Sequence, residues 1–402
     1  MKYLTILGST GSIGKATLNI IKNNNDKFVA YALVANTNVK LMTLQCLQFK
    51  PKYVCMVNNI AAIKLKNNLS INANVDTIVL SGIKYACELA KLDKIDIVMS
   101  AIVGIAGLKP TISALKAGKR VLLANKESLI SCGNIFMKEI SQNKSELFPV
   151  DSEHNAIIQL LPDDFSRKIG YKSILSYDIS KIILTGSGGS SLNIPLKQLK
   201  FITPNKICNH PTWSMGNKIS VDSATMINKG FEYIEACLLF GIPGNKIEIL
   251  LHPQSIIHAM VEYKDGSTLA QLANPDMKMY ISYAMSYPDR IKSTLTKLNI
   301  NKLNMLTFTY PNTDRYPCLE LAINAYKSGQ SSITILNASN EISVIYFLKG
   351  IINFTDISII NKKVLDELSV KEPTSIEEII LINKYAKIFT KKIINKYFLI
   401  NK

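Results

Sequence analysis

The feature that most constrains the fold of this chain is a glycine-rich turn close to its amino terminus. An apolar run at residues 4–7 leads directly into GSTGSIG at residues 8–14, and a helical pattern begins at Lys15. Glycines at this spacing let the backbone turn tightly and approach a pyrophosphate, whose charge then lies at the amino terminus of the helix. The pattern therefore predicts a dinucleotide site at the first strand-to-helix turn; the alternative is an ordinary tight turn.

Residues 1–150 alternate short apolar runs with helical patterns, which is typical of a parallel, doubly wound sheet. We predict an α/β fold in which this range forms a Rossmann-type dinucleotide-binding domain. The predicted strands lie at residues 4–7, 29–34, 53–57, 77–80, 95–101, 120–124 and 147–150.

The rest of the chain has a different pattern. Residues 151–290 contain short strands and Gly/Ser/Pro loops, and strands at 256–263 and 268–274 flank the Asp-Gly turn of a β-hairpin. Residues 291–316 have no regular pattern, and residues 317–402 are helical, with TSIE at 374–377 as a capping box for the last helix. We therefore predict a central α/β catalytic domain, a connecting linker and a C-terminal α-helical bundle.

The composition argues against several classes of protein. The net charge of +17 comes from dispersed lysines, and Lys, Asn and Ile are overused together, which indicates compositional drift rather than nucleic-acid binding. The longest nearly apolar run, residues 97–108, is shorter than the ~20 residues of a membrane-spanning helix. No signal peptide is evident and the seven cysteines include no CxxC pair, so we expect a cytoplasmic protein without a nucleic-acid or membrane partner.

The end of the second predicted strand favours NADP over NAD. An NAD enzyme usually has an acidic residue here to bind the adenosine ribose, whereas this chain has Asn36-Thr37-Asn38. The triplet also lacks an Arg or Lys for a 2′-phosphate, and Lys40 is the nearest cation. The strictness of the preference stays open.

Carboxylates follow the last predicted strand of the first domain. Asp151 and Glu153 are two residues apart, so their side chains share one face if the segment is extended. Glu232 lies three and four residues after Lys229 and Asn228, on one helical face. Carboxylate oxygens without cysteine ligands select Mg²⁺ or Mn²⁺, although such a pair of acids is also common at a solvated strand end.

Two serine-rich loops have the composition of phosphate sites. TGSGGS at residues 185–190 follows a predicted strand, and SVDSAT at residues 220–225 precedes Asn228 and Lys229. Hydroxyls, backbone amides and one lysine suit a phosphate monoester, and ordinary turn chemistry is the alternative. Between the loops, Trp213 either belongs to a lid over a ligand or anchors its loop in the core. His258, in the middle of a predicted strand, is interpreted as structural.

These residues belong to longer motifs that together cover essentially the whole chain. They are GSTGSIG (8–14), LANKESL (123–129), PVDSEHNAI (149–157), LTGSGG (184–189), HPTWSMGNKISVDSATMINKGFEYIEA (210–236), HPQSIIHAMVEYKDGS (252–267) and NASNEI (337–342). In these motifs and their order the chain resembles the 1-deoxy-D-xylulose 5-phosphate reductoisomerase family.

The resemblance implies a reaction and its cofactors. Enzymes of this family rearrange 1-deoxy-D-xylulose 5-phosphate and reduce the product with NADPH to 2-C-methyl-D-erythritol 4-phosphate, in the methylerythritol phosphate pathway to isoprenoid precursors. A divalent cation, Mg²⁺ or Mn²⁺ with Co²⁺ as an alternative, polarises the ketone and orients the fragments. The resemblance also implies a homodimer joined through the central domain.

The resemblance further implies a role for each matching residue. The catalytic residues are Lys126, Asp151, Glu153, His210 and Glu232. The metal ligands are Asp151, Glu153 and Glu232. The substrate is bound by Lys126, Ser152, Glu153, Ser187, His210, Ser223, Asn228, Lys229 and Glu232. The dinucleotide is lined by Thr10, Gly11, Ser12, Ile13, Asn36, Thr37, Asn38, Asn125, Glu127 and Gly216.

The chain departs from the family pattern at two places. The family commonly has Pro-Phe-Arg after LTGSGG, where this chain has Ser190-Ser191-Leu192. It also commonly has Gly-Lys-Asn where Asn36-Thr37-Asn38 stands. Neither departure changes an implied metal ligand. Two other hypotheses remain: an NADP-linked dehydrogenase that needs no metal, which EDTA would not inhibit, and a basic nucleic-acid-binding protein, whose binding would depend strongly on salt.

Overall fold

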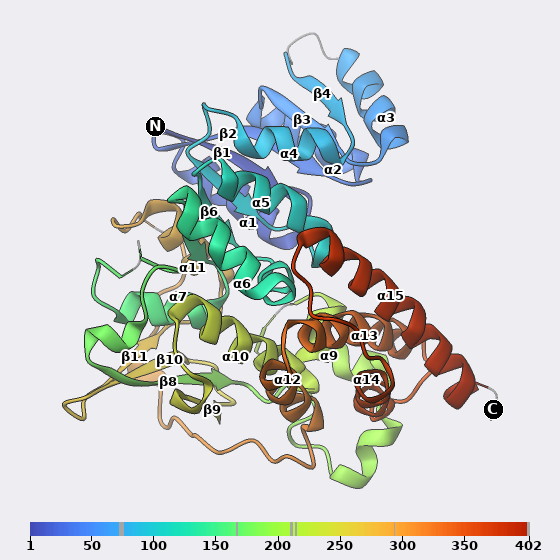
Figure 1. Ribbon diagram of the computed structural model, residues 1–402. Helices are drawn as coiled ribbons and strands as arrows, with labels where there is room; N and C mark the ends of the chain where they lie inside the picture. Colours follow the sequence, from blue (N-terminus) through green and yellow to red (C-terminus); the bar gives the residue numbers. More distant parts are fainter. Residues whose placement is uncertain (72–75, 166–167, 210–211, 214, 293, 400–402) are drawn as a thin grey trace.

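The computed structural model describes residues 1–402 except 72–75, 166–167, 210–211, 214, 293 and 400–402. Its first part is a parallel seven-stranded sheet with the strand order β4-β3-β2-β1-β5-β6-β7 (Figure 1). All seven predicted strands are confirmed. They are β1 (Lys2–Leu7), β2 (Phe28–Ala35), β3 (Tyr53–Met56), β4 (Ile78–Ser81), β5 (Ile97–Ser100), β6 (Arg120–Leu123) and β7 (Glu146–Pro149).

Helices cover both faces of this sheet because its central strands are buried on both sides. Leu4, Ile6 and Val98 have no exposed surface, and such strands need apolar cover above and below. α2 packs with α3 on one face, and α4, α5 and α6 pack in succession on the other. The helices are α1 (Ser12–Asn23), α2 (Val39–Phe49), α3 (Asn59–Ser70), α4 (Ile83–Lys91), α5 (Leu108–Lys116) and α6 (Lys126–Asn143), with the short η1 (Gly104–Gly107).

A second, mixed sheet of four strands has the order β11-β10-β8-β9. The strands are β8 (Ile179–Gly186), β9 (Ile247–Leu251), β10 (Ile257–Tyr263) and β11 (Thr268–Leu272). β10 and β11 are antiparallel neighbours, which confirms the predicted hairpin. α7 (Ser152–Leu160) and α10 (Ile227–Phe240) pack against this sheet.

Several shorter elements connect these layers. The helices are α8 (Pro204–Cys208), α9 (Asn217–Ala224) and α11 (Met277–Ser286), and the short turns are η2 (Ile174–Tyr177), η3 (Leu196–Phe201) and η4 (Gly244–Lys246). α11 packs against α1 and β6, so it ties the second part of the chain to the first sheet. The Arg120 side chain strengthens this contact, because it donates a hydrogen bond of 2.9 Å to the Tyr287 carbonyl.

The predicted irregular connection is followed by a group of helices. Residues 291–316 contain only η5 (Ile300–Lys302) and a single bridge from Thr309 to Leu251 among the described residues. The helices are α12 (Pro317–Ser328), α13 (Gln330–Leu348), α14 (Asp356–Glu367) and α15 (Ile376–Ile394), with η6 (Asn395–Leu399). α13 is central, since it packs on α12, α14 and α15 and also on α6 and α9 (Figure 1).

The predicted capping box of the last helix is wrong by one residue. Ser375, not Thr374, caps α15 by accepting a hydrogen bond from the Glu378 amide. Glu378 returns the contact by accepting from the Thr374 amide and hydroxyl. The serine and threonine lie side by side in the sequence, so spacing alone did not decide which of them caps the helix.

Two further observations concern the described residues as a whole. None of the helices in the described ranges is long and apolar enough to cross a membrane. All seven cysteines are free thiols. The domain boundaries at residues 150, 290 and 316 stay predictions.

Candidate active site

The glycine turn after β1 is a tight structure that excludes side chains. Gly8 has φ +89°, and a Cβ atom there would lie 2.5 Å from the Ala101 carbonyl oxygen. A Cβ atom on Gly14 would lie 2.4 Å from the Gly8 oxygen. Gly11 is the N-cap of α1 and provides no side-chain cap, so the first amides of α1 remain available as donors to an anion. Thr10, Gly11, Ser12 and Ile13 remain partly or fully exposed around these amides.

The predicted ribose end of the dinucleotide site lies beside this turn. β2 ends at Ala35, and Asn36, Thr37 and Asn38 follow it as exposed residues. The Asn38 side chain caps α2, since it accepts a hydrogen bond of 3.1 Å from the Leu41 amide. Asn38 therefore has a structural role in addition to the predicted one.

Asn125 connects the glycine turn to the carboxylates. Its side-chain nitrogen donates to the carbonyls of Ile102 (2.5 Å) and Gly104 (2.8 Å), which follow β5 next to Gly8. Its side-chain oxygen caps α6. Lys126 comes next in the chain and is 8% exposed. The first turn of α6 thus touches the dinucleotide end and the carboxylate end of the candidate site.

The three predicted metal ligands converge. Asp151, Glu153 and Glu232 each offer a carboxylate oxygen, and these oxygens lie within 4.8 Å of one another. The donor set consists of oxygens alone, which fits Mg²⁺ or Mn²⁺. The expected geometry was wrong, however: Asp151 is the N-cap of α7 and Glu153 lies in its first turn, so the segment is not extended. The two carboxylates lie close together because the N-cap and the first turn of α7 direct Asp151 and Glu153 to the same side of the helix.

Two buried lysines lie among these carboxylates. The Lys126 ammonium contacts Asp151, and Glu232 at 3.2 Å, and donates to the Asn228 side chain at 3.0 Å. The Lys229 ammonium contacts Glu153 at 2.8 Å and also Glu232. The prediction that Asn228, Lys229 and Glu232 share a helical face is confirmed, since Glu232 bonds to both of the others.

The pKa values of Glu153 and Glu232 are shifted in opposite directions. Burial would raise the pKa of Glu153, but the Lys229 ammonium and the Ser152 hydroxyl outweigh burial and hold the pKa below its usual range. Burial raises the pKa of Glu232, and the charge of Glu153 raises it further against the effect of Lys126 and Lys229. Glu232 is therefore the first of the pair to accept a proton.

A buried histidine and glutamate lie directly behind the carboxylates, and sequence reasoning missed them. His154 Nε2 donates to the Glu232 carbonyl at 2.9 Å, and His154 Nδ1 lies 3.3 Å from Glu235. Burial lowers the pKa of His154 to about 4 and raises that of Glu235 well above its usual range. The available signal was spacing, because each follows a metal-site acid, Asp151 or Glu232, by one helical turn.

The two predicted phosphate loops also meet. Gly189 has φ +67°, and a Cβ atom there would lie 2.6 Å from the Ala224 Cα, so the loop after β8 packs directly on the end of α9. This contact brings Ser187 and Ser223 to the same region. A Cβ atom on Gly186 would lie 3.0 Å from the Lys229 side chain, so the lysine reaches the same loop.

The departure at Ser190-Ser191-Leu192 is accommodated by hydrogen bonds. The Ser190 hydroxyl donates to the Ile207 carbonyl at 2.8 Å, and the buried Ser191 hydroxyl donates to the Ala224 carbonyl at 2.7 Å. Arg315 donates to the carbonyls of Ser191 and Ile194 at 2.9 and 2.7 Å. The segment is thus held in place, and a guanidinium from another part of the chain lies beside it.

The predicted lid segment is described only in part. His210 lies outside the described residues. Trp213 is half-buried, and its ring meets that of His258 edge-on at 5.8 Å, which favours the anchoring interpretation for this residue. His258 is 3% exposed and its Nε2 donates to the Ala273 carbonyl at 3.1 Å, which supports the predicted structural role. Gly216 is exposed and is the N-cap of α9.

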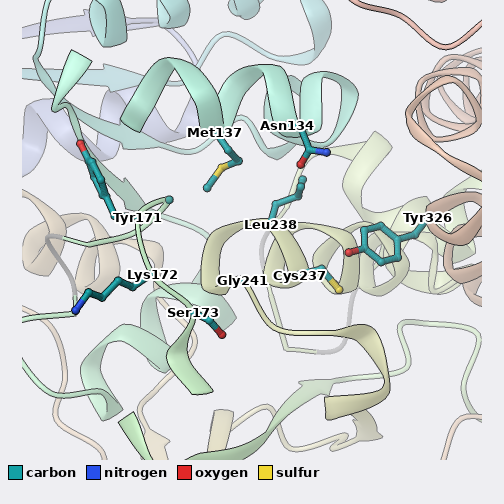
Figure 2. Close-up of a pocket in the computed structure, with 10 residues that line it drawn as sticks. Asn134, Met137, Tyr171, Lys172, Ser173, Cys237, Leu238, Gly241 and Tyr326 are labelled. Carbon is teal, nitrogen blue, oxygen red and sulfur yellow. The ribbon is translucent and has the colours of Figure 1, made fainter. Parts of the chain in front are cut away.

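A separate open cavity of about 310 Å³ lies at the far ends of α6 and α10 (Figure 2). Met137 of α6, Cys237 of α10 and Tyr326 of α12 are among its lining residues. None of the predicted site residues lines it. The cavity is therefore distinct from the candidate active site.

A glycine turn with uncapped helix amides is linked by Asn125 to a cluster of carboxylates and lysines. This arrangement is the one expected of a dinucleotide-binding, metal-assisted α/β enzyme. Comparison with known families agrees. Residues 4–133 match the family model for 1-deoxy-D-xylulose 5-phosphate reductoisomerase, and residues 147–240 and 272–389 match models of C-terminal domains of the same enzyme. The chain belongs to the 1-deoxy-D-xylulose 5-phosphate reductoisomerase family.

Individual relatives cover 96–99% of the chain. The enzyme of this name from Baumannia cicadellinicola is 56% identical over 96% of this chain and 97% of its own length. That from Photorhabdus laumondii is 51% identical over 99% and 100%. A crystal structure of the reductoisomerase with NADPH, fosmidomycin and magnesium is 40% identical, covers 99% of this chain and 100% of its own, and has a TM-score of 0.94. The Zymomonas mobilis enzyme with NADPH is 39% identical over 98% of both chains, with a TM-score of 0.88.

Proposed function

We propose that this chain catalyses the NADPH-dependent conversion of 1-deoxy-D-xylulose 5-phosphate to 2-C-methyl-D-erythritol 4-phosphate, a step in the synthesis of isoprenoid precursors. The observation that carries the proposal is the convergence of Asp151, Glu153 and Glu232 with Lys126 and Lys229. This cluster lies between a dinucleotide turn and two serine loops, in a chain of the corresponding family. One close structural relative binds NADPH, fosmidomycin and magnesium together.

Asp151, Glu153 and Glu232 are the proposed ligands of a divalent cation. Their converging oxygens support this assignment. When bound, such a cation polarises the carbonyl and neighbouring hydroxyl oxygens of the substrate. Lys126 is proposed to stabilise negative charge that develops on the substrate, because its buried ammonium is already held beside Asp151.

The sugar phosphate is proposed to bind across α9, α10 and the loop after β8. Ser187, Ser223, Asn228 and Lys229 would hold its phosphate, which is supported by the packing of Gly189 on Ala224. Ser152, Glu153, Glu232 and Lys126 would contact the carbon chain, as would His210, for which the family resemblance is the support. Lys126, Ser152, Lys229 and Glu232 are buried, and their burial would limit the access of water to the reacting atoms.

NADPH is proposed to bind at the glycine turn and to supply the hydride. The uncapped amides of α1 would bind its pyrophosphate. The turn after β2 and the first turn of α6 would line the rest. The residues are Thr10, Gly11, Ser12, Ile13, Asn36, Thr37, Asn38, Asn125, Glu127 and Gly216.

We also propose a cytoplasmic homodimer. β11 is the end strand of the second sheet, and it exposes Leu269 (46%) and Leu272 (38%). An exposed apolar edge strand is suited to pair with the same strand of a second copy. Sedimentation of the purified protein tests the dimer, and a monomer at micromolar concentration would contradict it.

The reaction is tested by loss of NADPH absorbance with the sugar phosphate and Mg²⁺. EDTA should stop the reaction, and NADH should support a slower rate because Asn36-Thr37-Asn38 offers no carboxylate to the ribose. Oxidation that continues undiminished in EDTA would instead favour a metal-independent dehydrogenase.

A further inference from the structure

The NASNEI motif of α13 contains none of the proposed site residues, yet its two asparagines are buried. Asn337 is 3% exposed and Asn340 is fully buried. Burial of an amide side chain is unfavourable unless its hydrogen bonds are made. The partners of these amides therefore show what α13 holds.

One asparagine and a neighbouring threonine hold α6. Asn337 donates to the Ser131 hydroxyl at 3.2 Å, and the Thr334 hydroxyl lies 3.1 Å from the Ser131 carbonyl, to which it donates. Ser131 is buried and lies one and a half turns after Lys126. α13 thus fixes the helix whose first turn carries Asn125, Lys126 and Glu127.

The other asparagine holds α9. Asn340 donates to Asp222 Oδ1 at 2.8 Å, and Asn361 of α14 donates to the Asn340 side-chain oxygen at 3.2 Å. Asp222 is 1% exposed and immediately precedes Ser223, a proposed phosphate ligand. α13 thus also fixes the helix that ends at the phosphate loop.

Lys218 joins the two helices directly. Its ammonium donates to Glu127 Oε1 at 2.7 Å and lies 3.0 Å from Asp222 Oδ2. Burial alone would lower the pKa of Lys218, but Asp222 and Glu127 outweigh it and raise the pKa above the usual range. Without the Lys218 ammonium, the carboxylates of Glu127 and Asp222 would face each other with no lysine between them.

We propose that Lys218 is a positioning residue that fixes the NADPH-lining turn of α6 against the phosphate-binding end of α9, with Asp222 held in place by α13. The inference rests on the proposed function. Hydride transfer needs the cofactor and the phosphorylated substrate at a set separation, and a displacement of about 1 Å can cost about 100-fold in rate.

Lys181 provides a matched control. It too bridges two carboxylates, Glu248 at 2.8 Å and Glu262 at 3.3 Å, and its side chain is 33% exposed, against 29% for Lys218. Lys181 lies on β8 outside the proposed machinery. The carboxylates beside Lys181 are more exposed, at 23% and 32%, than those beside Lys218, at 14% and 1%. Lys181→Met therefore measures the effect of losing a bridging lysine at a less buried position.

The test compares Lys218→Met, Lys218→Arg and Lys181→Met in the full-length protein. We expect Lys218→Met to weaken NADPH binding, measured by cofactor fluorescence without substrate, and to lower kcat/KM at least tenfold. Lys181→Met should stay within twofold of the wild type, and Lys218→Arg should recover most of the loss. Adding Asp222→Asn to Lys218→Met should restore part of the rate, because it removes one of the two facing charges and keeps the Asn340 contact.

The proposal is overturned if folded Lys218→Met matches Lys181→Met in both NADPH affinity and kcat/KM. It is also overturned if Asp222→Asn lowers the rate of Lys218→Met further. If Lys218→Met does not fold, the activity of Lys218→Arg tests the proposal instead. An activity near that of the wild type supports a positioning role for the positive charge at residue 218. A loss of activity as large as that of the single variant Asp222→Asn contradicts this role. Failure of wild-type turnover would contradict the proposed function, whereas the NADPH titrations test Lys218 independently.

Discussion

Replacing Lys229 by methionine should reveal how much the active-site lysines stabilise the carboxylate cluster. The Lys229 ammonium is 4% exposed and contacts Glu153 and Glu232. Removing one partner of a buried ion pair costs about 3–5 kcal/mol, because the remaining charge is left without compensation. Glu232 can offset part of this cost by taking up a proton, since its pKa is already raised. The loss should therefore lie near the lower limit.

The expected change in melting temperature follows from the size of the chain. Unfolding entropy is about 2.1 cal/mol/K per residue, so a 402-residue chain that unfolds as one unit loses about 4–6 °C for a 3–5 kcal/mol destabilisation. Lys181→Met is the control, because partly exposed ion pairs contribute about 0–1 kcal/mol. Its melting temperature should fall by about 1 °C or less.

Magnesium gives the decisive comparison. At the proposed metal site of the wild type, a divalent cation would compete with the Lys229 ammonium, which contacts Glu153 and Glu232. In Lys229→Met this competitor is removed. Mg²⁺ should therefore raise the melting temperature of Lys229→Met more than that of the wild type, as measured by calorimetry after EDTA treatment and after Mg²⁺ addition. The reasoning is refuted if Mg²⁺ raises the melting temperatures of both proteins equally, or if Lys229→Met and the wild type have the same melting temperature in EDTA.

Three further predictions concern the phosphate loop, the thiols and the cofactor. Gly189→Ala should raise the KM for the sugar phosphate about tenfold, because the new Cβ would lie 2.6 Å from the Ala224 Cα. The control Gly266→Ala, at φ +89° with no atom within 4 Å of its Cβ, should leave the KM unchanged. Equal KM values for the two variants would contradict the prediction. Burial raises the pKa values of five thiols to about 12, those of Cys46, Cys55, Cys132, Cys237 and Cys318. These thiols should resist iodoacetamide at neutral pH and react only as the pH rises, whereas half-buried Cys87 should react at neutral pH. Mass spectrometry gives the order of alkylation, and alkylation of a buried thiol before Cys87 would contradict the prediction. Thr37→Lys should increase the ratio of NADPH to NADH turnover several-fold by adding a cation beside the 2′-phosphate; an unchanged ratio would place that phosphate elsewhere.

The first sheet was predictable because its central strands are buried on both faces. Such strands appear as short apolar runs separated by helical patterns. Some strand boundaries differ from the prediction because a side chain takes the place of a backbone partner. Residues 95–101 were expected as one strand, but β5 is Ile97–Ser100. Asp96 instead accepts a hydrogen bond from the Tyr3 amide with its carboxylate, at 2.7 Å.

The candidate site was predictable in its residues more than in its geometry. Asp151 and Glu153 were found through their place after a strand, but they meet through the start of α7. His154 and Glu235 were missed because each is an ordinary buried position in the sequence, and only the packing of α7 on α10 brings them together. The Lys218–Glu127 contact joins residues 91 apart, which no local pattern encodes.

The central claim is that the carboxylate cluster and the glycine turn serve one reaction. The most direct test measures NADPH oxidation with 1-deoxy-D-xylulose 5-phosphate and Mg²⁺ for the wild type and for Asp151→Asn, with circular dichroism to establish that both are folded. The account predicts oxidation by the wild type that stops in EDTA, and none by Asp151→Asn. A wild-type rate in folded Asp151→Asn, or a wild-type rate that EDTA leaves unchanged, would contradict it.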